Sequence, residues 1–251
     1  MELMQTFKSA GYQFITFAEW CEKRSDLPQK FIILRHDIDK NPKNALKVAH
    51  LDHQIGIQST FYWLASSPVY HPSIIKKVFA LGHEIGYHYR DWVDAGGNPE
   101  MALKLFDFNL RKLRDLVPVK TIAMDGCPWS SFDNRDLWKD NDYKAFGIIG
   151  EPYIDLFGAH GAETNSDVYY MTDTGRMWDG EQYSVRDKVN DLQINDYHST
   201  KELIVGVLSA QLPNRIMITT HPQRWTDNWI DWTIERVMQW LKNHIKKGFY
   251  N

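Results

Sequence analysis

The sequence predicts an α/β protein: a parallel β-sheet with helices outside it, curled into a single-domain β/α barrel over residues 1–251. Three observations predict this class. Short apolar runs of strand character alternate along the chain with amphipathic helical patterns. The length of 251 residues lies in the range that β/α barrels reach as one domain. No repeat or linker-like change divides the composition, which is 43% hydrophobic and 24% charged.

The expected strands are short, and each is followed by a turn or a helix. They lie at 31–34, 60–64, 84–87, 121–124, 147–149, 168–171 and 216–219. The first helix opens at Asn41 and Pro42 and carries an apolar stripe to Leu51. Further helices are expected at 72–81, 99–116, 135–138 and 229–247. Because the carboxyl ends of the strands of a barrel gather at one rim, polar side chains that follow strands are the candidate site.

Composition and charge exclude several classes of function. The 29 basic and 32 acidic residues leave a net charge of −3, and no basic block marks a nucleic-acid surface. Cys21 and Cys127 form no disulfide framework. The first residues lack the layout of a signal peptide, and no apolar run approaches the ~20 residues of a membrane span. We therefore expect a cytoplasmic protein with no nucleic-acid partner and no membrane span.

Asp37 and Asp39 form the first candidate group, after the apolar run at 31–34. Two carboxylates this close can hold a cation between them or divide the roles of base and ligand. Helix capping is the plainer alternative, because Asp39 lies just before Asn41 and Pro42, where capping oxygens are common.

Histidines end two other expected strands. His88 follows 84–87, and Asp91 comes three residues later, so a helical turn there would place both side chains on one face. Imidazole and carboxylate ligands suit zinc and related metals. His221 ends the strand at 216–219, where an imidazole can act as general acid or base near neutral pH. A structural hydrogen-bonding role is the alternative for each histidine.

Asp125 and several tryptophans lie beside these groups. Asp125 follows the strand at 121–124 and either reaches the same site or caps the turn at 126–128. Trp129, Trp178 and Trp225 are candidates for a sugar-facing rim, with core packing as the alternative for each.

These motifs resemble the polysaccharide deacetylase superfamily, also described as the NodB-homology or carbohydrate esterase family 4 type. The resemblance covers most of the chain, from Phe31 to about Trp225. Its carriers are ILRHDID at 33–39, GIQSTFY at 56–62, LGHEIGYH at 81–88 and THP at 220–222. Three further segments are similar to a branch of this superfamily that is associated with surface-polysaccharide or O-antigen synthesis. They are GCP at 126–128, DNRDLW at 133–138 and HPQRW at 221–225.

The resemblance implies a distorted β/α barrel of seven strands and a divalent metal, commonly zinc. The activity it implies is hydrolysis of an acetyl group, usually N-acetyl, on an amino sugar linked to a nucleotide or lipid carrier. Asp37 matches the catalytic base and His221 the catalytic acid, while Asp39 and His88 match metal ligands. The substrate-binding candidates are Asp125, Trp129, Arg224 and Trp225.

The sequence also departs from the pattern of that superfamily. Its second motif histidine would fall at position 92, where this chain has Trp92, and its third motif is replaced by the segment around Asp125. A third metal ligand is therefore expected from Asp91, or alternatively from Asp125. If neither serves, the protein is a non-catalytic carbohydrate-binding homologue with a degenerate metal site. An amidase for a non-sugar substrate and a glycosidase that uses Asp37 with a second acid are further alternatives.

Overall fold

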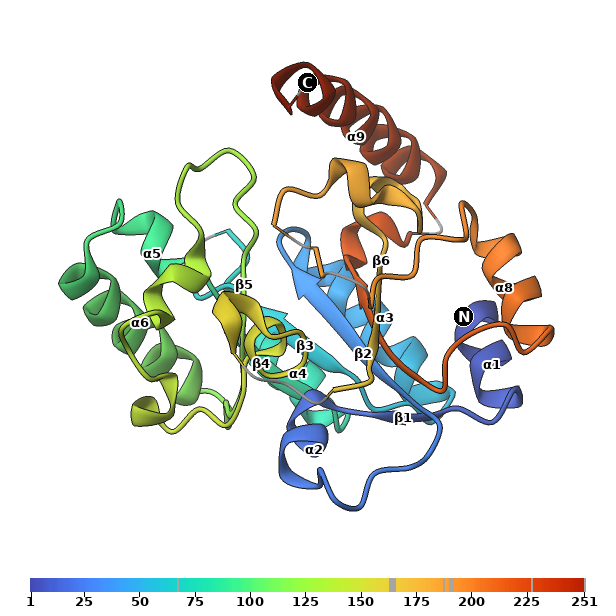
Figure 1. Cartoon of the computed structure of the whole chain (residues 1–251), viewed down its shortest axis with the longest axis horizontal. Helices are drawn as coiled ribbons and strands as arrows, with labels where there is room; N and C mark the ends of the chain where they lie inside the picture. Colours follow the sequence, from blue (N-terminus) through green and yellow to red (C-terminus); the bar gives the residue numbers. More distant parts are fainter. Residues whose placement is uncertain (67, 163–165, 187, 190–191, 227, 251) are drawn as a thin grey trace.

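A curled sheet of parallel strands forms the centre of the molecule (Figure 1). The computed structural model describes residues 1–251 apart from 67, 163–165, 187, 190–191, 227 and 251. Its strands are β1 (Gln13–Ile15), β2 (Phe31–Ile38), β3 (Thr60–Trp63), β4 (Glu84–Tyr89), β5 (Ile122–Met124), β6 (Tyr169–Thr172) and β7 (Arg215–Thr220). They follow the spatial order β5-β4-β3-β2-β7-β6, and β1 pairs with the start of β2. Every pair is parallel, as the alternation of strands and helices predicts.

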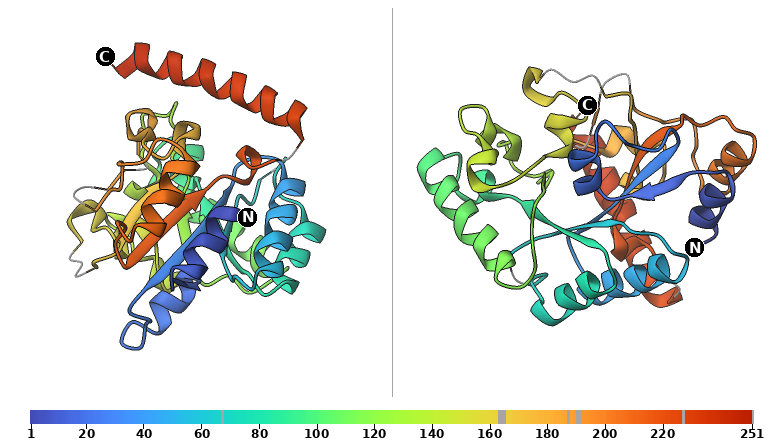
Figure 2. Two further views of the ribbon diagram at one scale, coloured as in Figure 1. Left: turned by 90° about the vertical axis from the view of Figure 1, so that its right-hand side faces the viewer. Right: turned by 90° about the horizontal axis from the view of Figure 1, so that it is seen from below.

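Helices cover the outside of this sheet, and α3, α4 and α6 follow its curve (Figure 2). The α-helices are α1 (Glu2–Ser9), α2 (Phe17–Glu22), α3 (Pro42–Gln54), α4 (Pro72–Ala80), α5 (Asp91–Asp94), α6 (Pro99–Arg114), α7 (Pro152–Asp155), α8 (Thr200–Leu208) and α9 (Trp229–Tyr250). Asn41 and Asn98 cap α3 and α6, each with a proline at the first helical position. These start signals explain why the longer helices fall where the sequence predicts them.

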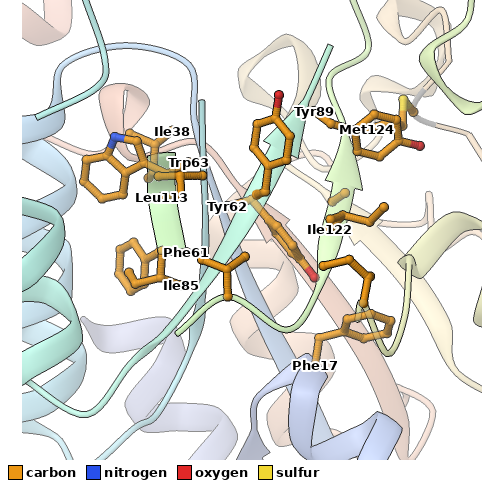
Figure 3. Packing of buried hydrophobic residues seen from close by; sticks show 14 of the residues in the cluster. Phe17, Ile38, Phe61, Tyr62, Trp63, Ile85, Tyr89, Leu113, Ile122 and Met124 are labelled. Atoms are coloured by element: carbon orange, nitrogen blue, oxygen red, sulfur yellow. The ribbon is translucent and has the colours of Figure 1, made fainter. Parts of the chain in front are cut away.

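Aromatic side chains pack against both faces of the sheet. All eight residues of β2 are buried, as expected for a central strand covered on both faces. Phe61 and Trp63 of β3 lie on one face of the sheet with Ile85 of β4, and Tyr62 lies on the other face (Figure 3). This packed interior holds the strand ends in fixed positions, which a catalytic site requires.

The sheet is a half-barrel that side chains complete. Within the described residues, no strand pairing joins β5 to β6. The predicted strand at 147–149 is wrong: Gly147 is left-handed, and only an isolated bridge joins Gly150 to Thr121. Farther on, the hydroxyls of Tyr153 and Tyr170 lie 3.2 Å apart and bridge the opening. The predicted α/β class with a distorted parallel sheet is thus confirmed, in an open form, and the seventh strand is β1, which was not predicted, in place of the one expected at 147–149.

The last helix, α9, lies outside the rest of the fold (Figure 2). It turns polar side chains inward, where Gln239 and Asn243 are buried. Its outer side exposes Ile230 at 50%, Ile234 at 58% and Val237 at 53%. Among the described residues, no helix is long and apolar enough to cross a membrane.

Candidate active site

A small cavity of about 130 Å³ lies where the carboxyl ends of β2, β4, β5 and β7 meet. Among the residues that sequence analysis singled out, those on its walls are Asp37, Asp39, His88, Asp125, His221 and Arg224. Asp91, Trp129 and Trp225 do not line this cavity. The rule that strand ends meet at one edge of a parallel sheet therefore places most of the candidates together.

Asp37 is held in place by an arginine from its own strand. Side chains two residues apart on a strand share a face, and the Arg35 guanidinium donates two hydrogen bonds to the Asp37 carboxylate, at 2.7 and 2.8 Å. Arg35 is fully buried, between the rings of Tyr62 and Tyr153. A carboxylate anchored in this way presents one fixed face to the cavity.

Asp39 lies between two imidazoles. Its Oδ1 is 3.4 Å from Nε2 of His88, and its Oδ2 is 3.8 Å from Nε2 of His221. Burial would raise the pKa of Asp39, but the hydrogen bond from His88 and the charge of His221 outweigh it and hold that pKa well below its usual range. The capping alternative for Asp39 receives no support, because the capping oxygen of α3 comes from Asn41.

His88 and Asp39 are the donor pair that fits a divalent cation. Their 3.4 Å separation is close to the distance between neighbouring ligands of a tetrahedral ion with bonds of about 2.1 Å. Nδ1 of His88 lies 3.0 Å from the carbonyl of Ala123, a contact that fixes the tautomer and leaves Nε2 free to bind a metal. Burial would lower the pKa of His88, but the Asp37 charge and the Asp39 hydrogen bond raise it to about 9.

A complete metal site is not assembled around this pair. In the part of the chain that the structure describes, no group of three or more His, Cys, Asp or Glu side chains is placed to hold a metal ion. Asp125 lines the same cavity, but its Oδ1 accepts a hydrogen bond from the amide of Cys127, as the turn-capping alternative requires. Its Oδ2 is 3.9 Å from Nη1 of Arg90. The geometry thus supplies two donors that fit a cation and no third one in position.

Asp91, the favoured third ligand, points elsewhere. The spacing argument assumed one helical turn over His88 and Asp91, but β4 extends to Tyr89 and α5 begins only at Asp91. Its carboxylate is fully buried and accepts hydrogen bonds from Tyr87 at 2.7 Å and from Asn109 at 2.8 Å. Burial raises the pKa of Asp91 to about 6. These contacts describe a structural carboxylate and do not support a metal ligand.

His221 is oriented by a carboxylate that the sequence analysis missed. Nδ1 of His221 lies 2.6 Å from Oδ1 of Asp173, and the His221 amide donates to Oδ2 of the same residue. Burial and the Arg224 charge lower the pKa of His221, but Asp173 outweighs both and raises it. With Nδ1 bound, the other ring nitrogen, Nε2, faces Asp39. The imidazole is therefore placed to give a proton at Nε2.

Asp173 also connects His221 with Arg224 and Trp225. Arg224 donates to its carboxylate at 2.6 Å and to its carbonyl at 2.7 Å, and the indole of Trp225 donates at 2.7 Å. The rule that selected Asp125 could have found Asp173, which comes two residues after the predicted strand at 168–171 and directly after the observed β6. Trp129 is 60% exposed and lines neither this cavity nor the larger one beside it.

Comparisons with known proteins find similarity at the level of structure. No family profile and no curated sequence matches the chain. Similar solved structures include a CE4 esterase from Streptococcus mutans, with 15% identity over 96% of this chain and 90% of that chain and a TM-score of 0.48. A family 4 carbohydrate esterase from Streptomyces lividans, in complex with acetate, has 12% identity over 87% of this chain and 90% of that chain, with a TM-score of 0.47.

A CE4 family pseudoenzyme from Bacillus anthracis is similar to the same degree. It has 11% identity over 86% of this chain and 61% of that chain, with a TM-score of 0.45. These neighbours in structure are two carbohydrate esterases of family 4 and a pseudoenzyme of that family. At these identities and TM-scores they carry no argument about activity, which must come from the site of this chain.

Proposed function

We propose that the protein hydrolyses an acetyl group, most readily an N-acetyl group, on an amino-sugar unit. The observation that carries the proposal is the convergence of Asp37, Asp39, His88 and His221 on one cavity, with an arginine fixing the first and a carboxylate orienting the last. A base and an acid on separate strands, each with its own positioning partner, are what amide hydrolysis needs. The resemblance to polysaccharide deacetylases supports the same reaction and a role in surface-polysaccharide synthesis.

Asp37 serves as the base in this proposal. Its carboxylate accepts the proton of an attacking water while Arg35 keeps it from turning away. His221 gives the proton from Nε2 to the departing amine, and Asp173 stabilises the imidazolium at Nδ1. The products are acetate and a free amino sugar.

Asp39 and His88 would hold the divalent cation, for which zinc is the expected choice. When bound, such an ion supplies the positive charge that polarises an acetyl carbonyl and lowers the pKa of water. The two side chains present the donor types and the separation that zinc requires.

The test is acetate release from N-acetylated amino sugars, with zinc added. Asp37→Asn keeps the shape of the side chain and removes its basicity, so kcat should fall by about 10²-fold or more. Asp107→Asn, on the exposed side of α6, is the matched control and should retain the rate of the unmodified protein. Equal rates for the two variants would contradict the role of Asp37.

A second function, a non-catalytic carbohydrate-binding protein, is favoured by one observation. No third metal donor is in position among the described residues. This alternative predicts binding of acetylated sugars without acetate release at any zinc concentration.

A further inference from the structure

A second cavity, of about 570 Å³, lies directly beside the candidate site. It is lined by α9, the start of α8 and two short helical turns, η4 (Thr174–Arg176) and η6 (Pro222–Arg224). Arg224 lines both cavities, and its Nη1 is 2.9 Å from Nδ1 of His221. A ligand in the larger cavity would therefore reach the wall that orients the proposed acid. The volume lies within the range of about 300–1,000 Å³ typical of small-molecule sites.

This cavity is cationic. Arg176, Arg224 and Arg236 all line it, and Asp173 is the carboxylate on its described walls. Asp173 is already engaged by His221, Arg224 and the indole of Trp225. Burial lowers the pKa of Arg176, and this effect outweighs the neighbouring Glu235 carboxylate, which raises it, while the charges of Arg224 and Arg236 act in the same direction as burial. Within the described residues, Nη1 of Arg176 and Nε of Arg224 are buried without a hydrogen-bond partner. Guanidinium groups crowded in this way favour an anion between them.

The same cavity is lined by indole rings. Its tryptophans are Trp178, Trp225, Trp232 and Trp240. Arg176 and Arg236 both approach the ring of Trp232, at 5.4 and 5.0 Å from its centroid. Indoles and guanidinium planes at this spacing stack on flat heterocycles, as they do on nucleic-acid bases.

α9 adds polar side chains to the cavity wall beside its two indoles. Gln239 and Asn243 are buried there, and Asn243 donates to the carbonyl of Gly175. Amides and a guanidinium on a cavity wall suit a polar ligand better than an acyl chain. This observation favours a water-soluble carrier over a lipid carrier.

We infer that the larger cavity binds the nucleoside diphosphate part of the substrate. The diphosphate lies among Arg176, Arg224 and Arg236, and the base stacks on the indoles. The inference rests on the proposed function only in placing the acetylated sugar in the smaller cavity, past Arg224. The substrate class is therefore a nucleoside diphosphate sugar.

Calorimetric titration of the full-length protein with UDP, ADP, GDP and CDP tests this directly. At least one should bind with a Kd in the micromolar range, about tenfold or more tighter than inorganic pyrophosphate, because the base adds stacking. Arg236→Gln, at an exposed position, and Arg176→Gln should each weaken that nucleotide about tenfold or more. Arg111→Gln, on the exposed side of α6, is the control and should leave the Kd unchanged.

Three results would overturn the inference. They are no nucleoside diphosphate binding below about 1 mM, equal affinity for pyrophosphate, or nucleotide binding that neither arginine variant weakens. Equal affinity for pyrophosphate would point to a diphosphate from a lipid carrier. These titrations do not use acetate release, so they test nucleotide binding independently of the proposed hydrolysis. Nucleotide binding without acetate release would contradict the proposed function and leave the inference about the larger cavity intact.

Discussion

At the scale of single residues, the pairing of His221 with Asp173 predicts how the activity depends on pH. Asp173 raises the pKa of His221, so the imidazole stays protonated, as a proton donor must, to a higher pH than an ordinary histidine. The Arg224 guanidinium acts in the opposite direction, with Nη1 at 2.9 Å from the ring. The useful pH range of the acid is therefore set by the balance of these two neighbours.

Asp173→Asn removes the stabilising charge and leaves Arg224 in place. The pKa of His221 should fall by about one unit or more, so the alkaline limb of the rate profile moves to lower pH. NMR titration of the His221 ring measures its pKa, and the rate of acetate release as a function of pH locates the alkaline limb of the profile. A variant with reduced stability but an unmoved pKa would show that Asp173 only supports the fold.

The metal ligands can be separated by substitution of single carboxylates. Asp39→Asn should lower the zinc affinity by more than the ~10–100-fold loss that is typical when a residue that only orients a ligand is changed. Asp91→Asn should leave zinc affinity nearly unchanged, because its oxygens are bound by Tyr87 and Asn109. Asp125→Asn should weaken zinc if the carboxylate turns from the Cys127 amide to complete the site. Competitive zinc titration at fixed pH ranks all three, and an Asp91 effect equal to that of Asp39 would reverse the assignment.

At the scale of elements, close packing fixes one glycine in the sheet. A Cβ added to Gly86, in β4, would collide with the buried ring of Tyr62, whose hydroxyl is held by Thr121. Gly86→Ala should therefore lower the free energy of unfolding by about 1–3 kcal/mol. Gly126→Ala is the matched control, because an added Cβ there meets no atom within 4 Å. Chemical denaturation of both variants measures the difference, and equal stabilities would contradict the packing argument.

The sequence predicts elements well where a local signal and burial agree. Apolar runs located β2 and β7, the Asn-Pro start located α3, and the strand-end rule then brought Asp37, His88 and His221 together. The segment at 147–149 is as apolar as a strand, yet the left-handed Gly147 ends a helical turn there. The direction of Asp91 could not be read from spacing, because it depends on where β4 ends and α5 begins.

The early part of the chain shows the same limit. No element was expected before residue 31, yet α1, β1 and α2 are present. These elements are short, and their stability comes from contacts distant in sequence, such as α1 against α8 and β1 against β2. Pairings of this kind leave little periodic trace in a three- to eight-residue segment.

At the scale of the whole molecule, α9 is separable from the packed interior. None of its described side chains belongs to the two hydrophobic clusters, and its inward contacts are mainly polar. A chain that ends after Thr226 should therefore unfold cooperatively, with a Tm within about 5 °C of that of the full chain. Nucleotide affinity should fall about tenfold or more, because Trp232 and Arg236 are lost from the cavity wall. Calorimetric scanning and titration of the shortened chain measure both quantities. Loss of cooperative unfolding would show that α9 stabilises the half-barrel itself, while retained affinity would mean that the nucleotide lies elsewhere.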